Sequence, residues 1–325
     1  MGAFGRNHAR VYKELEQQGE ALRLLGVVDQ DVTRADAVGR EFGCRSFGSL
    51  EQLLTTHSEV QAASVTVPTL HHLPVSSRLM EAGVDVLIEK PLASTLAEAG
   101  EIIDVAKQHQ RIAQVGHLER FNPAVRATIP LITQPMFFEV HRLSVFSPRA
   151  LDVDVVLDLM VHDLDIVLSF VNSPVQEVRA VGLPILSGKT DIANVRLEFA
   201  SGCVANFTAS RVSTERIRKL RFFQPKQYIS VDYSRQDVLV FTVGAEDSKI
   251  ATPSVNPDIG VMKPPITSEE PLRAELRSFL DAVRRRSMPV VTLEDGRRTL
   301  ALALQIVDDI HKHGSRINLE KLASL

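Results

Sequence analysis

The sequence predicts an α/β protein of two domains: a doubly wound parallel sheet, then an antiparallel sheet with one solvated face. Its 325 residues exceed one average domain and suit two. In the first part, short apolar runs alternate with helical stretches, which is typical of a parallel sheet covered by helices. In the second part, strands follow one another and alternate apolar and polar residues, as in 195–199. We place the domains at 1–117 and 118–325.

The first domain divides into regular elements with clear stops. We expect strands at 22–28, 62–67, 84–88 and 112–115 and helices at 33–42, 50–55, 73–82 and 94–108. Pro68 and Pro91 follow two of the strands, and Ser94 is the expected N-cap of the fourth helix. The carboxyl ends of parallel strands meet at one edge, where such sheets bind ligands.

The second domain begins its regular structure near residue 136. We expect strands at 136–143, 175–183, 194–199, 203–212, 219–223, 228–232 and 237–242. A buried helix is expected at 155–171, an exposed loop at 251–271, and helices at 271–286 and 294–313.

Composition excludes several classes of partner. Lys and Arg total 37 and Asp and Glu total 40, a formal charge of −3, so no basic excess favours nucleic acid or membrane surfaces. Apolar runs are too short to cross a bilayer, and the N-terminus does not read as a signal peptide, so we expect a cytoplasmic protein. Cys44 and Cys203 lie far apart without metal-ligand spacing, so we expect no disulfide and no metal.

A short glycine motif opens the chain. Gly2-Ala3-Phe4-Gly5 precedes a helical stretch and is similar to the second half of G-x-G-x-x-G, whose glycines let the backbone approach a pyrophosphate. The alternative is a flexible tail.

Asp29 ends the next strand, 24 residues after Gly5, where a carboxylate binds the adenosine ribose; the alternative is a turn residue. An acid there repels a 2′-phosphate and favours NAD over NADP, although Arg34 nearby keeps NADP open.

The first glycine of that motif and its preceding strand would fall before Met1. We therefore expect the native protein to start upstream. We also expect this chain to bind cofactor weakly, because the loss of a central strand leaves backbone N–H and C=O groups of the two neighbouring strands unpaired.

Residues suited to proton transfer stand at two places. Lys90 follows a buried strand directly, where partial burial makes a lysine a usable acid or a clamp on an alkoxide; the alternative is a surface turn. Asp158, His162 and Asp165 lie at i, i+4 and i+7 of the apolar helix, and an acid one turn away orients a histidine as a base. The alternative is a structural Asp–His pair.

Two further candidates adjoin strand ends. Arg120 follows the fourth strand and is expected to face cofactor or substrate where the domains meet; the alternative is a hinge salt bridge. His71 and His72 follow Pro68, and one of them is expected to line the nicotinamide pocket.

These motifs occur together in a recognisable order. The ordered set is Gly5-Arg6-Asn7-His8, Asp29, Pro68-x-x-x-His72, Glu89-Lys90-Pro91, Arg120-Phe121-Asn122-Pro123 and Asp158-x-x-x-His162-Asp163. Over essentially the whole chain the sequence resembles the Gfo/Idh/MocA family of NAD(P)-dependent oxidoreductases. The resemblance implies a Rossmann domain, an α/β domain with a large open antiparallel sheet, and catalytic roles for Lys90, Asp158 and His162.

The resemblance also implies the residues that bind ligands. The cofactor set is Gly2, Phe4, Gly5, Arg6, Asp29, Pro68, His72, Glu89, Lys90 and Arg120. The substrate set is Lys90, Arg120, Arg142, Arg149 and His162, in which Arg142 and Arg149 would meet a diphosphate; the alternative for both is exposed charge.

Within the family, the stretches 116–123 and 141–163 are similar to members acting on sugar nucleotides. This implies oxidation of UDP-N-acetylglucosamine at C3 to the 3-keto sugar for lipid A amino-sugar synthesis. The alternatives are an inositol or free-sugar dehydrogenase and a non-catalytic nucleotide-sensing regulator. We expect a homodimer or homotetramer formed through the exposed face of the antiparallel sheet.

Overall fold

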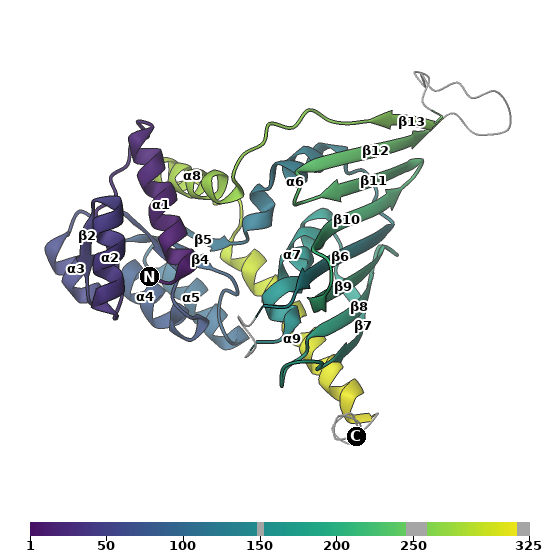
Figure 1. The fold of residues 1–325 in the computed structure, drawn as a ribbon, viewed down its shortest axis with the longest axis horizontal. Helices are drawn as coiled ribbons and strands as arrows, with labels where there is room; N and C mark the ends of the chain where they lie inside the picture. The colour runs from purple at the N-terminus through teal and green to yellow at the C-terminus, as the bar shows by residue number, and fades with distance from the viewer. Residues whose placement is uncertain (148–152, 245–258, 317–325) are drawn as a thin grey trace. The chain divides into compact units, whose positions relative to one another are not determined.

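The computed structural model describes residues 1–147, 153–244 and 259–316, which fold into two compact units (Figure 1). The first unit holds Met1–Phe121 and Glu270–Leu300, and the second holds Asn122–Glu269 and Ala301–Leu325. Residues 270–300 thus return to the first unit after the chain has built most of the second. The fold class predicted from the sequence is confirmed.

The first unit is built from parallel strands and helices. Its elements are α1 (Ala3–Gln17), β1 (Gly26–Val28), α2 (Val32–Phe42), β2 (Arg45–Phe47), α3 (Leu50–Thr56), β3 (Ala62–Val65), η1 (Thr69–His71), α4 (His72–Glu81), β4 (Asp85–Glu89), α5 (Leu96–Gln108), β5 (Ala113–Gly116), η2 (Leu118–Phe121) and α8 (Pro271–Arg285). The strands form two parallel sheets, β1-β2 and β3-β4-β5, and among the described residues no strand joins them.

Two local expectations for this unit were wrong. Strand β2 lies between the helices expected at 33–42 and 50–55, where no strand was predicted; a strand of three residues is too short for periodicity to reveal. The N-cap of α5 is Thr95, not Ser94, because the Thr95 hydroxyl accepts the Glu98 N–H three residues on. The Glu98 carboxylate returns to the Ser94 N–H at 2.9 Å, which completes a reciprocal cap.

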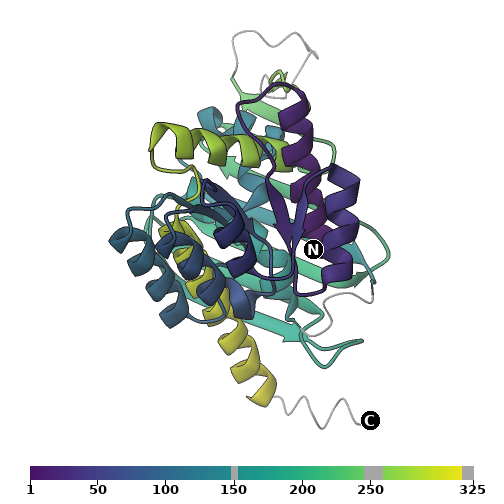
Figure 2. The same ribbon diagram turned by 90° about the vertical axis from the view of Figure 1, so that its left-hand side faces the viewer.

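Helices α1 and α8 come from opposite ends of the sequence and lie side by side (Figure 2). Val11 and Leu15 of α1 pack with Leu276 and Phe279 of α8 and with Leu87 of β4, and all five side chains are buried. This apolar contact explains why the return segment belongs to the first unit.

The second unit is dominated by one sheet of eight strands. Its elements are α6 (Pro123–Thr128), η3 (Ile129–Leu131), β6 (Phe137–Val145), η4 (Val156–Met160), α7 (Val161–Phe170), β7 (Val175–Leu183), β8 (Ile192–Phe199), β9 (Val204–Ser213), β10 (Ile217–Gln224), β11 (Gln227–Asp232), β12 (Asp237–Val243), β13 (Ile259–Met262) and the later turns of α9 (Leu293–Arg316). The strand order is β13-β12-β11-β10-β6-β9-β8-β7. All seven predicted strands are confirmed, whereas β13 lies in a stretch expected to be a loop.

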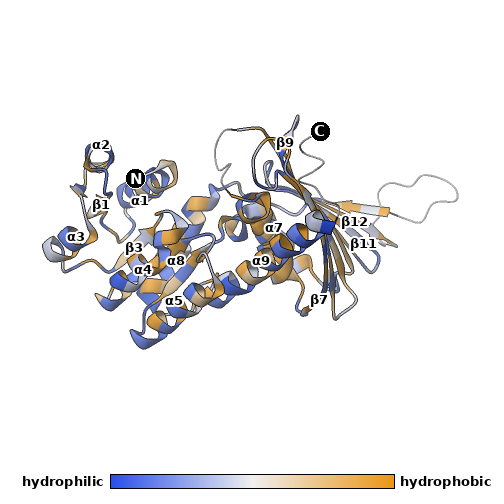
Figure 3. Cartoon of the chain, turned by 90° about the horizontal axis from the view of Figure 1, so that it is seen from below, coloured by the Kyte–Doolittle hydropathy of each residue, from blue (hydrophilic) through white to orange (hydrophobic). Residues whose placement is uncertain are grey.

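The sheet is mixed, since β6 and β9 run parallel while the other neighbours are antiparallel. One face is apolar and covers the core of the unit, where Phe138, Val195 and Phe207 pack with Ile166 of α7 and Ile306 of α9. Figure 3 shows apolar and polar residues intermixed along α9, as expected for a helix with one buried side.

The opposite face of the sheet carries a row of aromatic rings. Phe137, Phe223, Tyr228 and Phe241 come from four adjacent strands, with successive ring centroids 5.8, 4.9 and 5.4 Å apart. Phe223 is 41% exposed. We call these four side chains the aromatic row.

Candidate functional site

The glycine loop and Asp29 lie together in the first unit. Gly2 caps α1 without a side-chain bond, and a Cβ on Gly5 would lie 2.7 Å from the Thr66 hydroxyl, just beyond β3. Only glycine allows α1 to approach the strand this closely. Asp29 directly follows β1, accepts the Asp31 N–H at 2.8 Å and pairs with the Met1 amine. A helix N-terminus that glycines leave open to a ligand can bind the pyrophosphate of a dinucleotide, and a neighbouring carboxylate can bind its ribose.

The other loop residues of the predicted cofactor set make contacts of their own. Arg6 forms a bidentate pair with Glu41, and Phe4 is exposed with its ring 5.3 Å from that of His8. Pro68 precedes the short helix η1.

Glu89 supports the strand end from which Lys90 projects. It is buried, its Oε1 lies 3.1 Å from Nε2 of His8, and its Oε2 accepts the Lys90 N–H at 3.3 Å. A Cβ on Gly116 would lie 2.7 Å from Glu89 Oε1, so β5 closes over the carboxylate. Lys90 itself is half-buried, as expected at the end of β4.

His72 lies beneath the Lys90–Pro91 turn. Its side chain is 1% exposed, with Nδ1 3.0 Å from the Pro91 carbonyl and Nε2 3.0 Å from the Val67 carbonyl. Burial lowers the pKa of His72, and the carbonyl contacts oppose the shift. The geometry supports a positioning role for His72, which holds two strand-end loops together.

Arg120 leaves β5 through η2, and its Nη2 lies 3.9 Å from Asp295 Oδ1 of α9, with the Arg120 side chain 14% exposed. Burial raises the pKa of Asp295, but hydrogen bonds from Thr292 and the Arg120 and Arg298 charges lower it overall. The pair joins two parts of the first unit.

Asp158 and His162 stand at a helix irregularity in the second unit. Residues Val156–Met160 form a π-helical turn, and the regular helix begins at Val161, so the predicted single helix is two segments. A π turn rotates the residues before it relative to an α-helix, and such turns are frequent at functional sites. Both side chains are half-buried, whereas Asp165 is buried.

Arg142 is buried, so the alternative interpretation of the sequence, in which it is an exposed charge, was wrong. It reaches from β6 to the helix and donates from Nε at 2.7 Å and Nη2 at 3.0 Å to Asp163, the residue after His162. Its guanidinium also lies 5.4 Å from the Tyr233 ring centroid. This bidentate pair fixes the first turn of α7.

Arg149 lies outside the described residues. The structure also shows four buried polar residues to which the sequence analysis gave no role: His8 and Asp163, named there only as parts of motifs, and Asp191 and Arg211, not named at all. Strand alternation was an available signal for Arg211, which shares its side of β9 with the buried Phe207 and Ala209.

Comparison with known proteins identifies the family. Residues 1–117 match the model of the Gfo/Idh/MocA oxidoreductase family, NAD-binding Rossmann fold, and residues 136–228 match a Gfo/Idh/MocA C-terminal domain. The UDP-N-acetylglucosamine 3-dehydrogenase of Acidithiobacillus ferrooxidans is 35% identical over 307 residues, 94% of each chain. The chain belongs to the Gfo/Idh/MocA oxidoreductase family.

A solved structure of the same enzyme and one further relative extend the comparison. A solved structure of the Acidithiobacillus ferrooxidans enzyme matches with a TM-score of 0.85 and 34% identity over 95% of each chain. An inositol 2-dehydrogenase of Rhizobium meliloti is 24% identical, covering 93% of this chain and 92% of the relative. The expected dehydrogenase class and NAD-binding Rossmann domain are thereby confirmed.

Two absences complete the description. Within 1–147, 153–244 and 259–316, no helix combines the length and hydropathy needed to span a membrane. Over the same residues, no three His, Cys, Asp or Glu side chains gather as metal ligands.

Proposed function

We propose that the protein oxidises the C3 hydroxyl of UDP-N-acetylglucosamine with NAD, giving the 3-keto sugar nucleotide that leads to the amino sugar of lipid A. The observation that carries this proposal is the 35% identity to a UDP-N-acetylglucosamine 3-dehydrogenase over 94% of both chains. The half-buried Asp158 and His162 on one braced helix start support it, because a general base must be both fixed and reachable.

The chain's own residues divide the chemistry as follows. His162 takes the proton of the C3 hydroxyl as general base. Asp158, four residues earlier, orients the imidazole and offsets its developing positive charge. Lys90 donates a hydrogen bond to the same oxygen and stabilises the developing alkoxide. When bound, NAD accepts the hydride from the sugar carbon.

Further residues would hold the two ligands. Gly2, Gly5 and Asp29 would take the pyrophosphate and ribose of NAD, and the Asp29 carboxylate would repel the 2′-phosphate of NADP. Glu89 and His72 would fix the loop that bears Lys90. Arg120, Arg142 and Arg149 complete the proposed substrate set, in which Arg142 would act through Asp163.

The test is a substrate panel with purified protein and NAD, followed by NADH absorbance at about 340 nm and product mass. We expect turnover of UDP-N-acetylglucosamine with loss of two hydrogens from the sugar, and none with myo-inositol or free glucose. Turnover of myo-inositol alone would favour the inositol dehydrogenase suggested by the second relative. NAD binding without any hydride transfer would favour a sensor.

We further propose that a second copy of the chain covers the outer sheet face, giving a homodimer or homotetramer. The aromatic row supports this, because stacked rings on a solvated face cost free energy when left in water. Sedimentation analysis of wild type and Phe223→Asp tests it. Dissociation of the variant is expected, and a monomeric wild type would contradict the proposal.

A further inference from the structure

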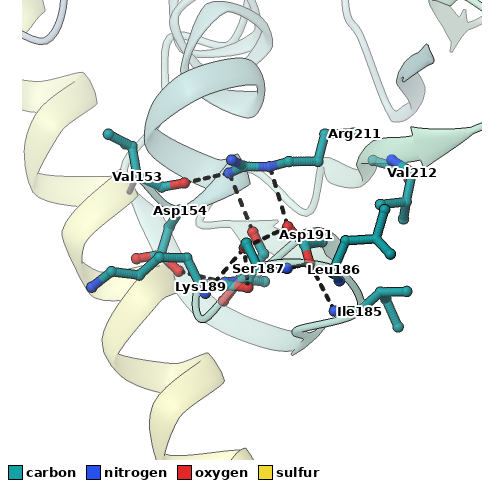
Figure 4. A network of polar contacts seen from close by, with 11 residues as sticks. Val153, Asp154, Ile185, Leu186, Ser187, Lys189, Asp191, Arg211 and Val212 are labelled. Carbon is teal, nitrogen blue, oxygen red and sulfur yellow. Dashed lines mark hydrogen bonds and ion pairs between the residues drawn. The ribbon is translucent and has the colours of Figure 1, made fainter. Parts of the chain in front are cut away.

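Asp191 and Arg211 form a buried polar cluster at the start of the helix that carries Asp158 and His162 (Figure 4). Asp191 is fully buried at the end of the β7–β8 loop, and Arg211 lies on β9 with 5% exposed surface. A buried charge is tolerated only when paired and hydrogen-bonded, so this cluster holds its surroundings in one arrangement.

The Asp191 carboxylate first closes its own loop. Its Oδ2 accepts the N–H groups of Ile185, Leu186 and Ser187 at 2.7, 2.6 and 2.8 Å, and Oδ1 accepts the Ser187 hydroxyl at 2.7 Å. Although burial opposes it, this bonding holds the pKa of Asp191 down at about 2. The loop is thereby tied to a carboxylate that is ionised at neutral pH.

The same cluster then reaches the helix start. Arg211 Nε lies 3.6 Å from Asp191 Oδ1, and its Nη2 donates to the carbonyl of Val153. Thr190 binds the segment at two points: its N–H donates to Asp154 Oδ1 at 3.1 Å, and its carbonyl accepts the Val155 N–H at 2.9 Å.

One further bond connects this anchor to the proposed catalytic turn. The Asp158 N–H donates to the Asp154 carbonyl at 3.0 Å, so the residue held by Thr190 also begins the turn that carries Asp158. The Arg142–Asp163 pair holds the turn just after His162. Buried Asp–Arg pairs therefore stand on both sides of Asp158 and His162.

We infer that Asp191 and Arg211 are positioning residues, which set the register of residues 153–158 and so aim Asp158 at His162. This inference rests on the proposed function for its catalytic meaning. Its structural content, that Asp191 holds residues 153–158 in place, does not depend on the substrate.

The experiment compares Asp191→Asn with a matched control, Asp85→Asn, in the full chain. Asp85 is also buried, accepts the Ile112 N–H at 2.8 Å and pairs with Arg286, but it lies at the start of β4 in the first unit. Ser187→Ala provides a milder variant, since it removes one bond to Asp191 and leaves the three backbone bonds in place.

Hydrogen exchange and enzyme kinetics are both measured well below each variant's Tm. In Asp191→Asn we expect hydrogen exchange of peptides covering 153–162 to accelerate, and kcat per folded protein to fall about 10- to 100-fold, as for a misplaced catalytic group. The KM for NAD should stay within about twofold. The deuterium isotope effect at the oxidised carbon should rise, which lower stability alone would not cause. Ser187→Ala should shift the same quantities less.

The outcomes separate the two proposals. If wild type turns over no sugar, the proposed function fails, and hydrogen exchange alone decides the inference. Unchanged exchange at 153–162 in both Asp191→Asn and Ser187→Ala would overturn it. So would equal changes in Asp85→Asn. If Asp191→Asn does not fold, Ser187→Ala decides.

Discussion

His162 is the residue on which the proposed chemistry depends most directly. Replacing it with Ala should lower kcat about 10²- to 10⁴-fold, the usual contribution of a general base. The Kd for NAD should not change, because the cofactor features lie in the first unit. Steady-state kinetics and calorimetric NAD titration check this. His141→Ala on β6 is the control and should retain turnover; a His162→Ala variant as active as wild type would remove this residue from the mechanism.

Asp29 should decide between NAD and NADP. Substitution by Ser removes the charge that repels a 2′-phosphate, so the ratio of kcat/KM for NAD to that for NADP should fall. Asp31→Ser is a matched control, because Asp31 caps α2 by accepting the Arg34 N–H and serine preserves that bond. A wild-type protein that already prefers NADP would contradict the assignment.

Single residues also show where sequence reasoning stopped. Lys90 and His162 were selected as candidates because their residue types suit proton transfer and their positions follow from local pattern. His8 was named only as part of a motif and given no role of its own, because its 3.1 Å contact with Glu89 joins residues 81 positions apart. A local motif cannot report a partner that the fold alone brings near.

Among the elements, strand β5 makes a testable prediction at Gly116, where we expect any added side chain to be destabilising. A Cβ there would lie between 2.7 and 3.0 Å from the Glu89 carboxylate, which holds the Lys90 N–H. Gly116→Ala should therefore cost about 1–3 kcal/mol of stability, as overpacking does, and lower kcat by moving the strand end. Chemical denaturation and kinetics test both effects.

The matched control is Gly100→Ala in α5, where a new Cβ meets nothing within 4 Å. That change should stabilise the protein by about 0.5–1 kcal/mol, because alanine favours helix over glycine. Equal stability changes for the two variants would show that contact with Glu89 is not the cause.

The elements differ in how well the sequence predicted them. Strand β7 was placed at 175–183, as found, because valines recur along this stretch and Pro174 and Pro184 bound it. Strands β2 and β13, of three and four residues, were missed because pairing partners stabilise them, not their own pattern. The π turn at Val156–Met160 was also missed, because apolar periodicity does not distinguish one π-helical turn from an α-helical one.

At the level of the whole molecule, His72 should make stability depend on pH. Burial lowers its pKa below the ordinary value of 6.5, so the unfolded state binds a proton first as pH falls. The contribution of His72 to the free energy of unfolding is therefore fully present above about pH 6.5 and is lost progressively as the pH drops below that value. Tm measured between pH 7.5 and about 5.5 should fall in wild type and fall less steeply in His72→Gln. His71→Gln, at the exposed neighbouring position, should follow wild type; parallel slopes for wild type and His72→Gln would refute the role of burial.

Fold class, most elements and the motif residues followed from the sequence, because apolar periodicity, strand stops and helix caps act over a few positions. The family followed from the order in which the motifs occur along the chain, which can be read without the structure. The return of α8 to the first unit, the burial of Arg142 against Asp163 and the Asp191–Arg211 cluster came only from the folded chain. Each depends on which distant surfaces bury one another, and burial is a property of the packed core, which a sequence window does not contain.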